Sequence, residues 1–365
     1  MAFELSDEQA MLRDALDRYL RDADALGLAA RDPGVQRRIW QGLVDDIGVI
    51  GAAFAEEAGG FGGTQMDVFA VMEPFGRHQA RTPYVAVVML AALLRDLPDA
   101  ALAAKAAEGR LIPAFAHGEG GRFDLTRAAT VAEPAGEGWR LTGRKAVVLS
   151  GPLATHFVVT AQVAGAGMTL FLVDAGAEGL ARQDYMAVDG QSACDLTLAA
   201  TPARMLGAPG QGVAALAPAV DAGLAALGAE AVGIMAGLIE HTAAYMRQRQ
   251  QFGQPLAAFQ ALQHRVADMV IAREQALSMV HMAQDALERG TGAETRAACA
   301  AMKIVVDRSL RFVSQNAVQL HGGMGITDEL AIGGWFRRAM VIAASFGSED
   351  DHFRTYEAQA ASMQD

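Results

Sequence analysis

Cysteine is scarce in this chain of 365 residues, which contains only Cys194 and Cys299. Neither cysteine belongs to a C-x-x-C pair or lies at a metal-ligand spacing from a histidine, so the sequence predicts neither a zinc site nor a disulfide framework. Basic residues are also few, because 30 Lys and Arg stand against 42 Asp and Glu and leave a net charge of -12. This balance argues against nucleic acid as a partner, since successive phosphates need cations in series. A single nucleotide, which needs one local arginine, stays compatible with it.

Apolar stretches long enough to cross a membrane without a charge are missing too. Pro83 to Leu94 has only the length of a core helix, and the run 222–239 contains Glu230. The first residues, Met-Ala-Phe-Glu-Leu-Ser-Asp-Glu-Gln, are acidic and lack the apolar segment of a secretory signal. We therefore expect a soluble cytoplasmic protein without a membrane partner.

Helix-forming residues are abundant, and 52% of the chain is hydrophobic. A chain of this length is expected to form two or three domains. The first, residues 1–112, is predicted to be helical and to start with a capping box formed by Ser6 and Gln9. Further helices are predicted over 35–48, 65–80 and 84–108. The glycine-rich stretch 56–64 neither follows a strand nor contains a Walker lysine, which favours a plain turn over a phosphate-binding loop.

Short apolar segments separated by Gly and Asp clusters follow, and they predict a small sheet or barrel domain over 113–205. Gly136-Glu-Gly138 is predicted to be a hairpin turn in it. The expected strands are 130–133, 139–143, 145–149, 156–161 and 168–173. Residues 206–365 are predicted to form a four-helix bundle, which makes the chain mainly α with a middle β domain. Its expected elements are 214–250, 259–289, 295–320 and 331–358. Very apolar outer helices in such a bundle predict association with itself or with a partner.

The stretch 247–269 is predicted to contain a break between two helices of this bundle, because Gly253 and Pro255 interrupt the pattern. Arg247 and Arg249 end the first helix, where cations suit the negative end of the dipole. They either only cap that helix, or a guanidinium beside the tight turn binds a phosphate. The apolar face predicted to be buried in the second helix consists of Phe259, Leu262, Val266, Met269 and Val270.

A second stretch, Val318-Gln-Leu-His-Gly-Gly-Met-Gly-Ile-Thr-Asp-Glu329, bears on that choice. Gly322 and Gly323 either stop a helix or let the backbone approach a ligand closely. His321 either bonds a carbonyl at a helix end or contacts the ligand. Histidines without a metal partner at a useful spacing are expected to be structural, and no metal site is predicted: these are His241, His264 and His281.

The three-part order, together with three motifs, resembles the acyl-CoA dehydrogenase family. The motifs are Arg249-Gln-Gln-Phe-Gly253, Phe259-Gln260 and Gln319-Leu-His-Gly-Gly-Met-Gly325. The resemblance covers nearly the whole chain, and three motifs in this order are far more specific than any one. It implies an N-terminal helical domain, a middle β domain, a C-terminal four-helix bundle, and FAD bound across a subunit interface.

The resemblance also implies roles for particular residues toward a neighbouring subunit's flavin. Arg249 would bind its phosphate, and a forked guanidinium suits phosphate oxygens. Phe252 and Gln260 would pack beside the nucleotide. Backbone close to the nucleotide is implied for Gln319, Gly322 and Gly323.

The chain departs from the family where the catalytic base should be. Most members have a Glu directly before a Gly-Thr pair, and this carboxylate removes the α-proton of the acyl-CoA while hydride leaves to the flavin. The corresponding tripeptide is Phe346-Gly-Ser348, so an apolar ring replaces the carboxylate. A minority of members place the Glu on the long helix before the arginine turn, and that position falls at about Gly223. We therefore assign no catalytic residue, and we expect the nearby Asp221 and Glu230 to be structural.

The family also contacts the flavin ring with a T-E-P-x-x-G-S-D segment and a W-x-T strand. Here these places read Ala116-His-Gly-Glu-Gly-Gly-Arg-Phe-Asp124 and Val147-Val-Leu149, so leucine replaces a hydroxyl donor. An α,β-dehydrogenation needs a base on one face of the substrate and a hydride acceptor on the other. The chain keeps the residues that would serve a neighbouring subunit's nucleotide, which form half of an FAD site, but it lacks the base. In this combination it resembles the smaller subunit of heteromeric acyl-CoA dehydrogenases that act on steroid side-chain or pimeloyl-type CoA thioesters.

Under this first hypothesis the chain completes the FAD site of a homologous large subunit in a heterotetramer. The complex oxidises an acyl-CoA in fatty acid or steroid degradation, with an electron-transfer flavoprotein as acceptor. A second hypothesis is an autonomous homotetramer, a dimer of dimers, whose base has moved. A third is a binding protein that uses the same fold without redox chemistry. The candidates for a displaced base are Glu349, Asp350, Asp351 and His352. The alternative interpretation is that these residues only form a solvated charge cluster at a helix end.

Overall fold

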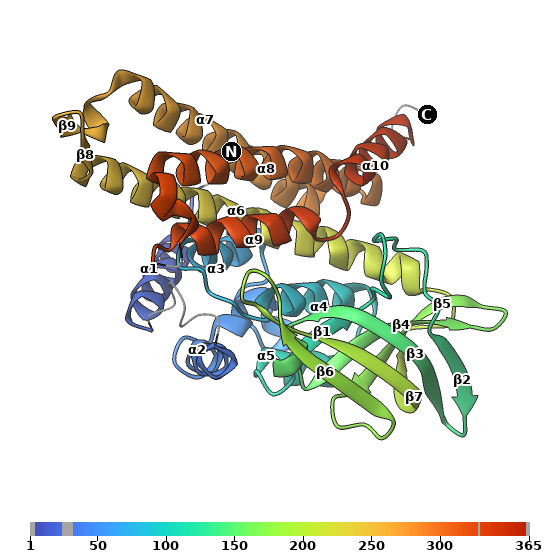
Figure 1. The fold of residues 1–365 in the computed structure, drawn as a ribbon. Helices are drawn as coiled ribbons and strands as arrows, with labels where there is room; N and C mark the ends of the chain where they lie inside the picture. The colour runs from blue at the N-terminus through green and yellow to red at the C-terminus, as the bar shows by residue number, and fades with distance from the viewer. Residues whose placement is uncertain (1–3, 24–31, 328, 363–365) are drawn as a thin grey trace.

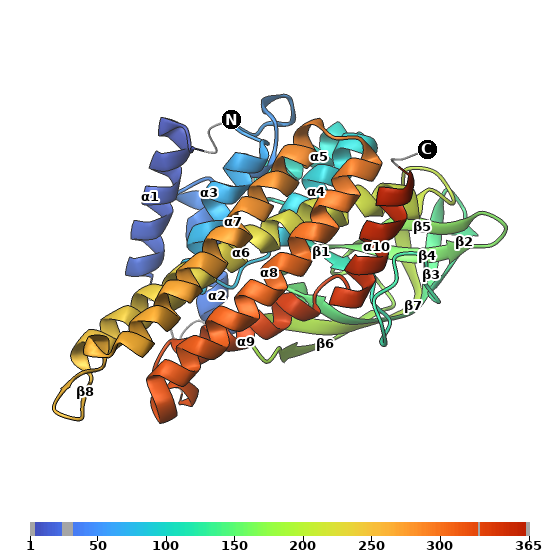
Figure 2. The same cartoon turned by 90° about the horizontal axis from the view of Figure 1, so that it is seen from above.

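The computed structural model describes residues 4–23, 32–327 and 329–362. Along the chain, helices precede and follow a group of strands, as predicted (Figure 1). Figure 2, seen from above, places the strands at one side of the molecule and the C-terminal helices across the N-terminal ones. The fold class is confirmed, while the exact division into three domains stays a prediction.

The N-terminal part is helical, and its first helix begins at the predicted capping box. Ser6 Oγ accepts from the Gln9 N–H, and Gln9 Oε1 accepts from the Ser6 N–H. The predicted helix over 84–108 is two helices, because Leu97 and Pro98 interrupt it. The elements are α1 (Asp7–Asp22), α2 (Pro33–Asp45), η2 (Val49–Ala53), η3 (Glu56–Ala58), α3 (Gln65–Arg77), α4 (Tyr84–Asp96) and α5 (Ala100–Ala107).

The middle part is a small closed barrel. Strands β4, β2, β3, β7 and β5 pair in that order, and β5 pairs back with β4. β1 and β6 extend it at β4 and β7. Its interior is a separate apolar cluster that includes Leu141, Phe157 and Phe171. The strands are β1 (Pro113–Ala116), β2 (Val131–Ala135), β3 (Gly138–Leu149), β4 (His156–Val163), β5 (Gly167–Asp174), β6 (Leu180–Met186) and β7 (Ser192–Leu206).

The predicted hairpin turn joins β2 and β3, where Ala135 pairs with Gly138 and Gly136 has a φ of 62°. The strands predicted over 139–143 and 145–149 are one strand, β3, with register shifts against β7. These shifts bend the strand and allow one long segment to follow the curved barrel wall. The strands β1, β6 and β7 were not predicted.

The C-terminal part is a helical bundle in which α6, α7 and α8 pack on one another and α9 and α10 pack on α8. The single fourth element predicted over 331–358 is wrong, because two helices occupy it. Phe346 and Gly347 separate them with φ of 59° and 115°, outside the right-handed helical region. The elements are α6 (Gly212–Gln248), α7 (Gln260–Arg289), α8 (Gly292–His321), η6 (Gly322–Ile326), α9 (Ile332–Ala344) and α10 (Glu349–Ser362).

α6 is the central helix of the fold and contacts helices from both ends of the chain. A Cβ on Gly76 of α3 would lie 1.9 Å from Glu230 O, and one on Gly233 would lie 1.9 Å from Glu73 O. The backbones of α3 and α6 therefore touch, which requires glycine at both crossings. Among the described residues α6 is long and apolar enough to span a membrane by length and composition, but 89% of its apolar window is buried within the molecule.

The face of α7 that was predicted to be buried is buried only in part. Met269 is buried, and Phe259, Leu262 and Val266 are half-buried. The prediction is wrong for Val270, which is 40% exposed because this side of the helix points away from the chain's own core. Other large apolar side chains exposed on the C-terminal helices are Ile271, Met282, Phe312, Met340, Phe353 and Tyr356. Such an apolar exterior is typical of a surface that associates, and association stays a prediction.

Candidate functional site

The helix break predicted around Gly253 is a β-hairpin that projects from the end of the bundle (Figure 1). Strands β8 (Gln250–Gln251) and β9 (Gln254–Pro255) pair antiparallel directly after α6. Phe252 and Gly253 form the tip with φ of 54° and 81°, as a two-residue hairpin turn requires. Phe252 is 90% exposed, so the tip makes no contribution to the chain's own core.

Arg249 is the C-terminal cap of α6 and the first residue of the hairpin. Its N–H donates to Tyr245 O at 2.8 Å and its carbonyl accepts from Leu256 N at 2.9 Å, so the backbone is fixed while the side chain is exposed. No carboxylate of the described ranges lies within ion-pair distance of this guanidinium, and the sequence has no Asp or Glu from His241 to Ala267. The position suits a helix cap, and the free guanidinium suits a phosphate from outside the chain.

The glycine turn follows α8. Gly322 has φ of 60° and ψ of -141°, a backbone region that glycine alone adopts readily. A Cβ on Gly322 or Gly323 would meet no atom within 4 Å. The packing of the chain therefore does not explain the glycine at 323, and the backbone there is open to a group from outside.

Tyr245 joins the two stretches. Residues His241, Tyr245 and Arg249 succeed one another at intervals of four on α6 and share one of its faces. The Tyr245 ring stacks on the His321 ring with centroids 4.3 Å apart, and its hydroxyl donates to His321 O at 3.4 Å. Because Gly322 follows His321, the hairpin end of α6 and the glycine turn lie at the same end of the bundle.

His321 is a buried helix-end histidine. It is 5% exposed, and its Nδ1 donates to Ala317 O at 2.8 Å, which confirms the carbonyl-bonding interpretation. His241 packs edge-on against Trp335 with centroids 4.9 Å apart, which confirms a structural role. His281 is buried and bonds Gln284 at 3.0 Å, which is structural as well. The structural expectation for the exposed His264 stays a prediction.

The residues that the resemblance assigns to the nucleotide all face outward. They come from the hairpin, the first turn of α7 and the end of α8, and each of them is exposed. An interface site requires this orientation, although nucleotide binding by these residues stays a prediction. They are Arg249, Phe252, Gln260, Gln319, Gly322 and Gly323.

The two positions where a catalytic base was sought lie against one another. A Cβ built on Gly223 of α6 would lie 3.6 Å from Phe346 Cε2 and 2.9 Å from Met89 Cγ. The Phe346 ring also packs edge-on against Phe123, with centroids 5.7 Å apart. The sequence could show that each position lacks a carboxylate, but only the fold shows that they form one apolar contact.

The carboxylates nearest to these positions have structural partners, as predicted. Asp221 is in an ion pair with Arg296 at 3.2 Å, and burial raises its pKa to about 6 despite that partner. Glu230 accepts two hydrogen bonds from the Arg338 guanidinium at 2.6 and 2.7 Å. Neither carboxylate is left free to remove a proton from a substrate.

The cluster at the start of α10 was predicted to be solvated, and this is wrong for three of its four members. Glu349 is in an ion pair with Arg308 at 2.6 Å. Asp351 accepts from the Ser348 N–H at 3.0 Å and pairs with Arg122. His352 is buried. The partners Arg308 and Arg122 come from α8 and from the loop before β2, which the local sequence could not reveal. Asp350 is the exposed member.

The loop between β1 and β2, where the family contacts the flavin ring, is held by a buried ion pair. Lys145 Nζ lies 2.6 Å from Glu119 Oε1 and is buried beneath the loop. Burial opposes ionisation of Glu119, but hydrogen bonds from Lys145 and Thr130 lower the pKa of its carboxyl to about 2. His117 in the same loop bonds the Thr160 hydroxyl at 3.1 Å. This pair has no local sequence pattern, because only the fold brings its two residues together.

On the strand that replaces W-x-T, Val147 is 61% exposed and has a φ of 55°, which is rare for a β-branched residue. Its N–H donates to Asp195 Oδ1 at 2.9 Å, which holds this bulge in place. Leu149 is half-buried and has no hydroxyl to offer a ring. Within the described ranges no three His, Cys, Asp or Glu side chains form a group that could hold a metal ion.

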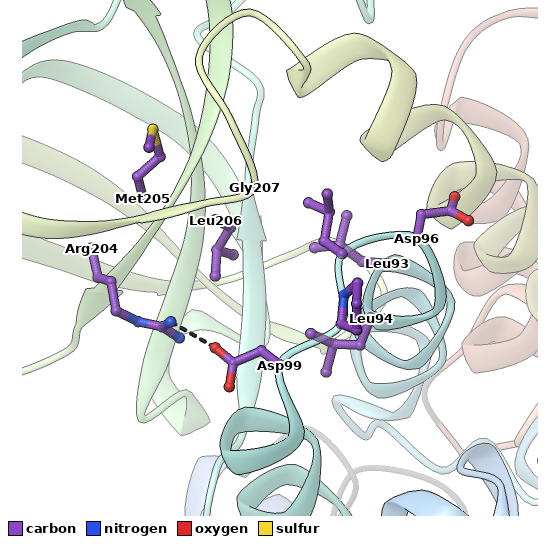
Figure 3. A pocket seen from close by; sticks show the side chains of 10 residues that line it. Leu93, Leu94, Asp96, Asp99, Arg204, Met205, Leu206 and Gly207 are labelled. Carbon is purple, nitrogen blue, oxygen red and sulfur yellow. Dashed lines mark hydrogen bonds and ion pairs between the residues drawn. The ribbon is translucent and has the colours of Figure 1, made fainter.

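A cavity of about 290 Å³ lies at the junction of α4, α5 and β7 (Figure 3). Its walls include Leu93, Leu97 and Leu206, and an ion pair between Arg204 and Asp99 at 2.6 Å borders it. Gly207 on its wall shortly precedes the start of α6, a helix of 37 residues and therefore roughly 55 Å long. The cavity is thus remote from the hairpin at the other end of α6.

Three models of the acyl-CoA dehydrogenase family match this chain: the N-terminal domain over residues 6–119, the middle domain over 115–201 and the C-terminal domain over 210–360. These matches cover nearly the whole fold of helices, barrel and bundle. The chain belongs to the acyl-CoA dehydrogenase family. Members of this family are FAD-dependent oxidoreductases.

Individual relatives agree with that assignment. The chain is 29% identical to the probable acyl-CoA dehydrogenase FadE25 of Mycobacterium tuberculosis, over 93% of this chain and 92% of that protein. It is 30% identical to a chain of a variant of the Tcur3481-Tcur3483 steroid acyl-CoA dehydrogenase, with a TM-score of 0.87 and coverage of 98% and 99%. It shares the fold of a chain in the ChsE4-ChsE5 complex from Mycobacterium tuberculosis, at 24% identity, a TM-score of 0.84 and coverage of 99% on both sides.

Proposed function

We propose that this chain is the non-catalytic subunit of a heteromeric acyl-CoA dehydrogenase. It presents the hairpin and the glycine turn to an FAD held by a homologous partner, and the complex oxidises an acyl-CoA thioester between its α and β carbons. The contact between Phe346 and Gly223 carries this proposal. Both places where the resemblance puts a base meet in an apolar contact, so neither offers a proton acceptor.

The barrel side of this chain supports the same division of labour. Phe123 packs edge-on against both His117 and Phe346, with centroids 5.4 and 5.7 Å apart. Both ring nitrogens of His117 are engaged, one with Thr160 Oγ1 and the other with Asp124 O at 2.9 Å. These side chains bond one another where the resemblance calls for groups that contact the flavin ring. The ring contacts and the base are therefore assigned to the partner.

A flavin nucleotide fits the outward half-site by the chemistry of its groups. The Arg249 guanidinium, which has no carboxylate partner in the described part of the chain, would hold phosphate oxygens, and the open backbone at Gly322 and Gly323 would approach the nucleotide. Phe252 and Gln260 would pack beside it. FAD supplies the hydride acceptor when bound, whereas the residues of this chain bind and orient its nucleotide.

A displaced base within this chain is less well supported. Glu349 and Asp351 are already in ion pairs, and His352 is buried against the backbone of the Phe346 turn. The steroid enzyme among the relatives supports a steroid side-chain CoA thioester as the substrate class. A heterotetramer in the cytoplasm, with an electron-transfer flavoprotein as acceptor, completes the proposal.

Substitution of Arg249 in the co-expressed complex tests the half-site. We expect Arg249→Gln to leave the complex assembled and to lower its flavin content about tenfold or more, because a hydrogen bond to a charged group contributes roughly 1.5–3 kcal/mol. Arg265→Gln removes the same charge from an exposed position on α7 and should retain flavin. Equal flavin content in the two variants would show that Arg249 does not bind the nucleotide.

A further inference from the structure

The pair of Tyr245 and His321 links the two stretches of the proposed half-site. The planes of its rings are 29° apart, and the Tyr245 hydroxyl donates to the carbonyl of the peptide that begins the glycine turn at Gly322. Tyr245 is also one helical turn before Arg249 on the same face of α6. Movement of this pair would therefore displace the arginine and the glycine turn relative to one another.

The tautomer of His321 follows from its neighbour. Nδ1 lies 2.8 Å from the Ala317 carbonyl, which can only accept, so Nδ1 carries the proton of the neutral ring. Nε2 is then the nitrogen that gains a proton when the ring becomes charged. Burial lowers the pKa of His321 and so favours the neutral ring in the free chain, while the bond to Ala317 opposes that shift.

The described charged groups provide no counter-charge for a protonated His321 ring. From α6, His241 disfavours a positive charge on the His321 ring. On α9, which packs on α8, the guanidinium of Arg338 is neutralised by two buried carboxylates. In the parts of the chain that the structure describes, no carboxylate forms an ion pair with His321. A counter-charge for the imidazolium would have to come from a group outside this described part of the chain, such as a bound ligand.

We propose that Tyr245 and His321 are positioning residues of the nucleotide half-site, and that His321 gains a proton when a nucleotide diphosphate binds at the glycine turn. This inference rests on the proposed function. The diphosphate provides the counter-charge that His321 does not have among the described residues, and the face of the Tyr245 ring stabilises the imidazolium. Because the bound state holds more protons, nucleotide binding strengthens as the pH falls from 8 toward 6.

The dissociation constant of FAD from the co-expressed complex, measured at pH 6 and pH 8, tests this linkage. We expect binding to be about two- to tenfold tighter at pH 6, since a shift of one pKa unit corresponds to a tenfold change. His321→Gln should remove that difference. His156→Gln, a histidine of the barrel, is the matched control and should keep it.

Two substitutions of Tyr245 test the positioning role. Tyr245→Phe retains the stacked ring and should keep both the affinity and its pH dependence. Tyr245→Leu removes the ring and should weaken FAD binding several-fold at both pH values, because neither the arginine nor the glycine turn would be held in place. The melting temperature of each complex, measured in parallel, separates this effect from a loss of folding.

The results of these experiments distinguish a failure of this inference from a failure of the proposed function. A pH difference that persists in His321→Gln would overturn the proton linkage, and unchanged affinity in Tyr245→Leu would overturn the positioning role. In both cases a complex that still binds FAD leaves the proposed function standing. A complex that holds no FAD with the unaltered chain would refute the proposed function itself, and this inference with it.

Discussion

His352, near the start of α10, is buried, and its Nε2 has no hydrogen-bond partner in the described part of the chain. Burial, reinforced by the nearby charge of Lys303, lowers the pKa of this imidazole to about 4. An unfolded chain takes up the proton near 6.5, whereas the folded chain does so only near 4. The stability that this difference represents is present above pH 6.5 and is lost as the pH falls toward 4.

We therefore predict that His352→Leu flattens the acid side of the stability curve. Between pH 6.5 and 4 the unaltered chain should lose up to about 3 kcal/mol through this group, at 1.36 kcal/mol per pKa unit. Asp221 and Asp307, whose pKa values burial raises to about 6, act in the opposite direction in both chains. The difference between two denaturant-unfolding series therefore isolates His352, and parallel curves would contradict the prediction.

Glu349 is the displaced-base candidate closest to the lost position in sequence. Because it is in an ion pair with Arg308, we expect Glu349→Gln to leave turnover of the co-expressed complex unchanged and to lower stability by less than about 1 kcal/mol. Steady-state kinetics with an acyl-CoA substrate would measure this. A large loss of turnover, with the complex intact, would instead support a catalytic role in this chain.

At the residue scale, the sequence indicated which chemical groups each position lacks or has, but not which residues contact one another. It identified Phe346 and Gly223 as positions without a base, but not their contact across the bundle. It placed Glu349 in a solvated cluster, because the partner arginine comes from another helix. Long-range ion pairs leave no local pattern, so the pair of Glu119 and Lys145 could not be predicted either.

The hairpin after α6 is the element most exposed to a partner, and its tip provides a test with little effect on folding. We predict that Phe252→Ala leaves the melting temperature of the lone chain unchanged, because this ring is 90% exposed. In the co-expressed complex the same substitution should reduce flavin retention several-fold. Met11→Ala on α1, where the side chain is 63% exposed, is the control and should change neither quantity. Unaltered flavin retention in the Phe252 variant would mean that the tip does not meet the nucleotide.

Elements with a strong apolar period were predicted well, and elements without one were missed. β6 is exposed at every position but its first, so it has no alternation to detect. β7 contains Ala, Asp and Pro residues, which are depleted in strands, so it owes its conformation to the barrel. The break between α9 and α10 depends on positive φ at Phe346, a conformation that residue type does not indicate.

On the scale of the whole molecule, Arg338 connects the C-terminal bundle to the middle barrel. Its guanidinium on α9 bonds Glu230 on α6 at 2.6 Å, and Asp189 and Gln191 in the turn before β7 at 2.9 and 2.8 Å. All four side chains are buried. The three-part order of the chain was predictable from sequence, but this junction between its parts was not, since its members are far apart in the chain.

We predict that Arg338→Met lowers the free energy of unfolding by about 3–5 kcal/mol, because two buried carboxylates lose their counter-charge. Arg204→Gln breaks a partly exposed pair with Asp99 and should cost less than about 1 kcal/mol. Chemical denaturation of both variants measures the contrast. Similar small losses would show that the junction does not hold the bundle and the barrel together.

An absorption spectrum tests the central claim most directly. It is measured on the chain purified alone and on the chain co-expressed with an acyl-CoA dehydrogenase-like protein from a neighbouring gene. The proposed half-site predicts a colourless chain when it is purified alone. It predicts a flavin spectrum in the complex, near one FAD per heterodimer. Stoichiometric flavin in the lone protein would contradict the proposal, because the barrel of this chain would then bind the ring by itself.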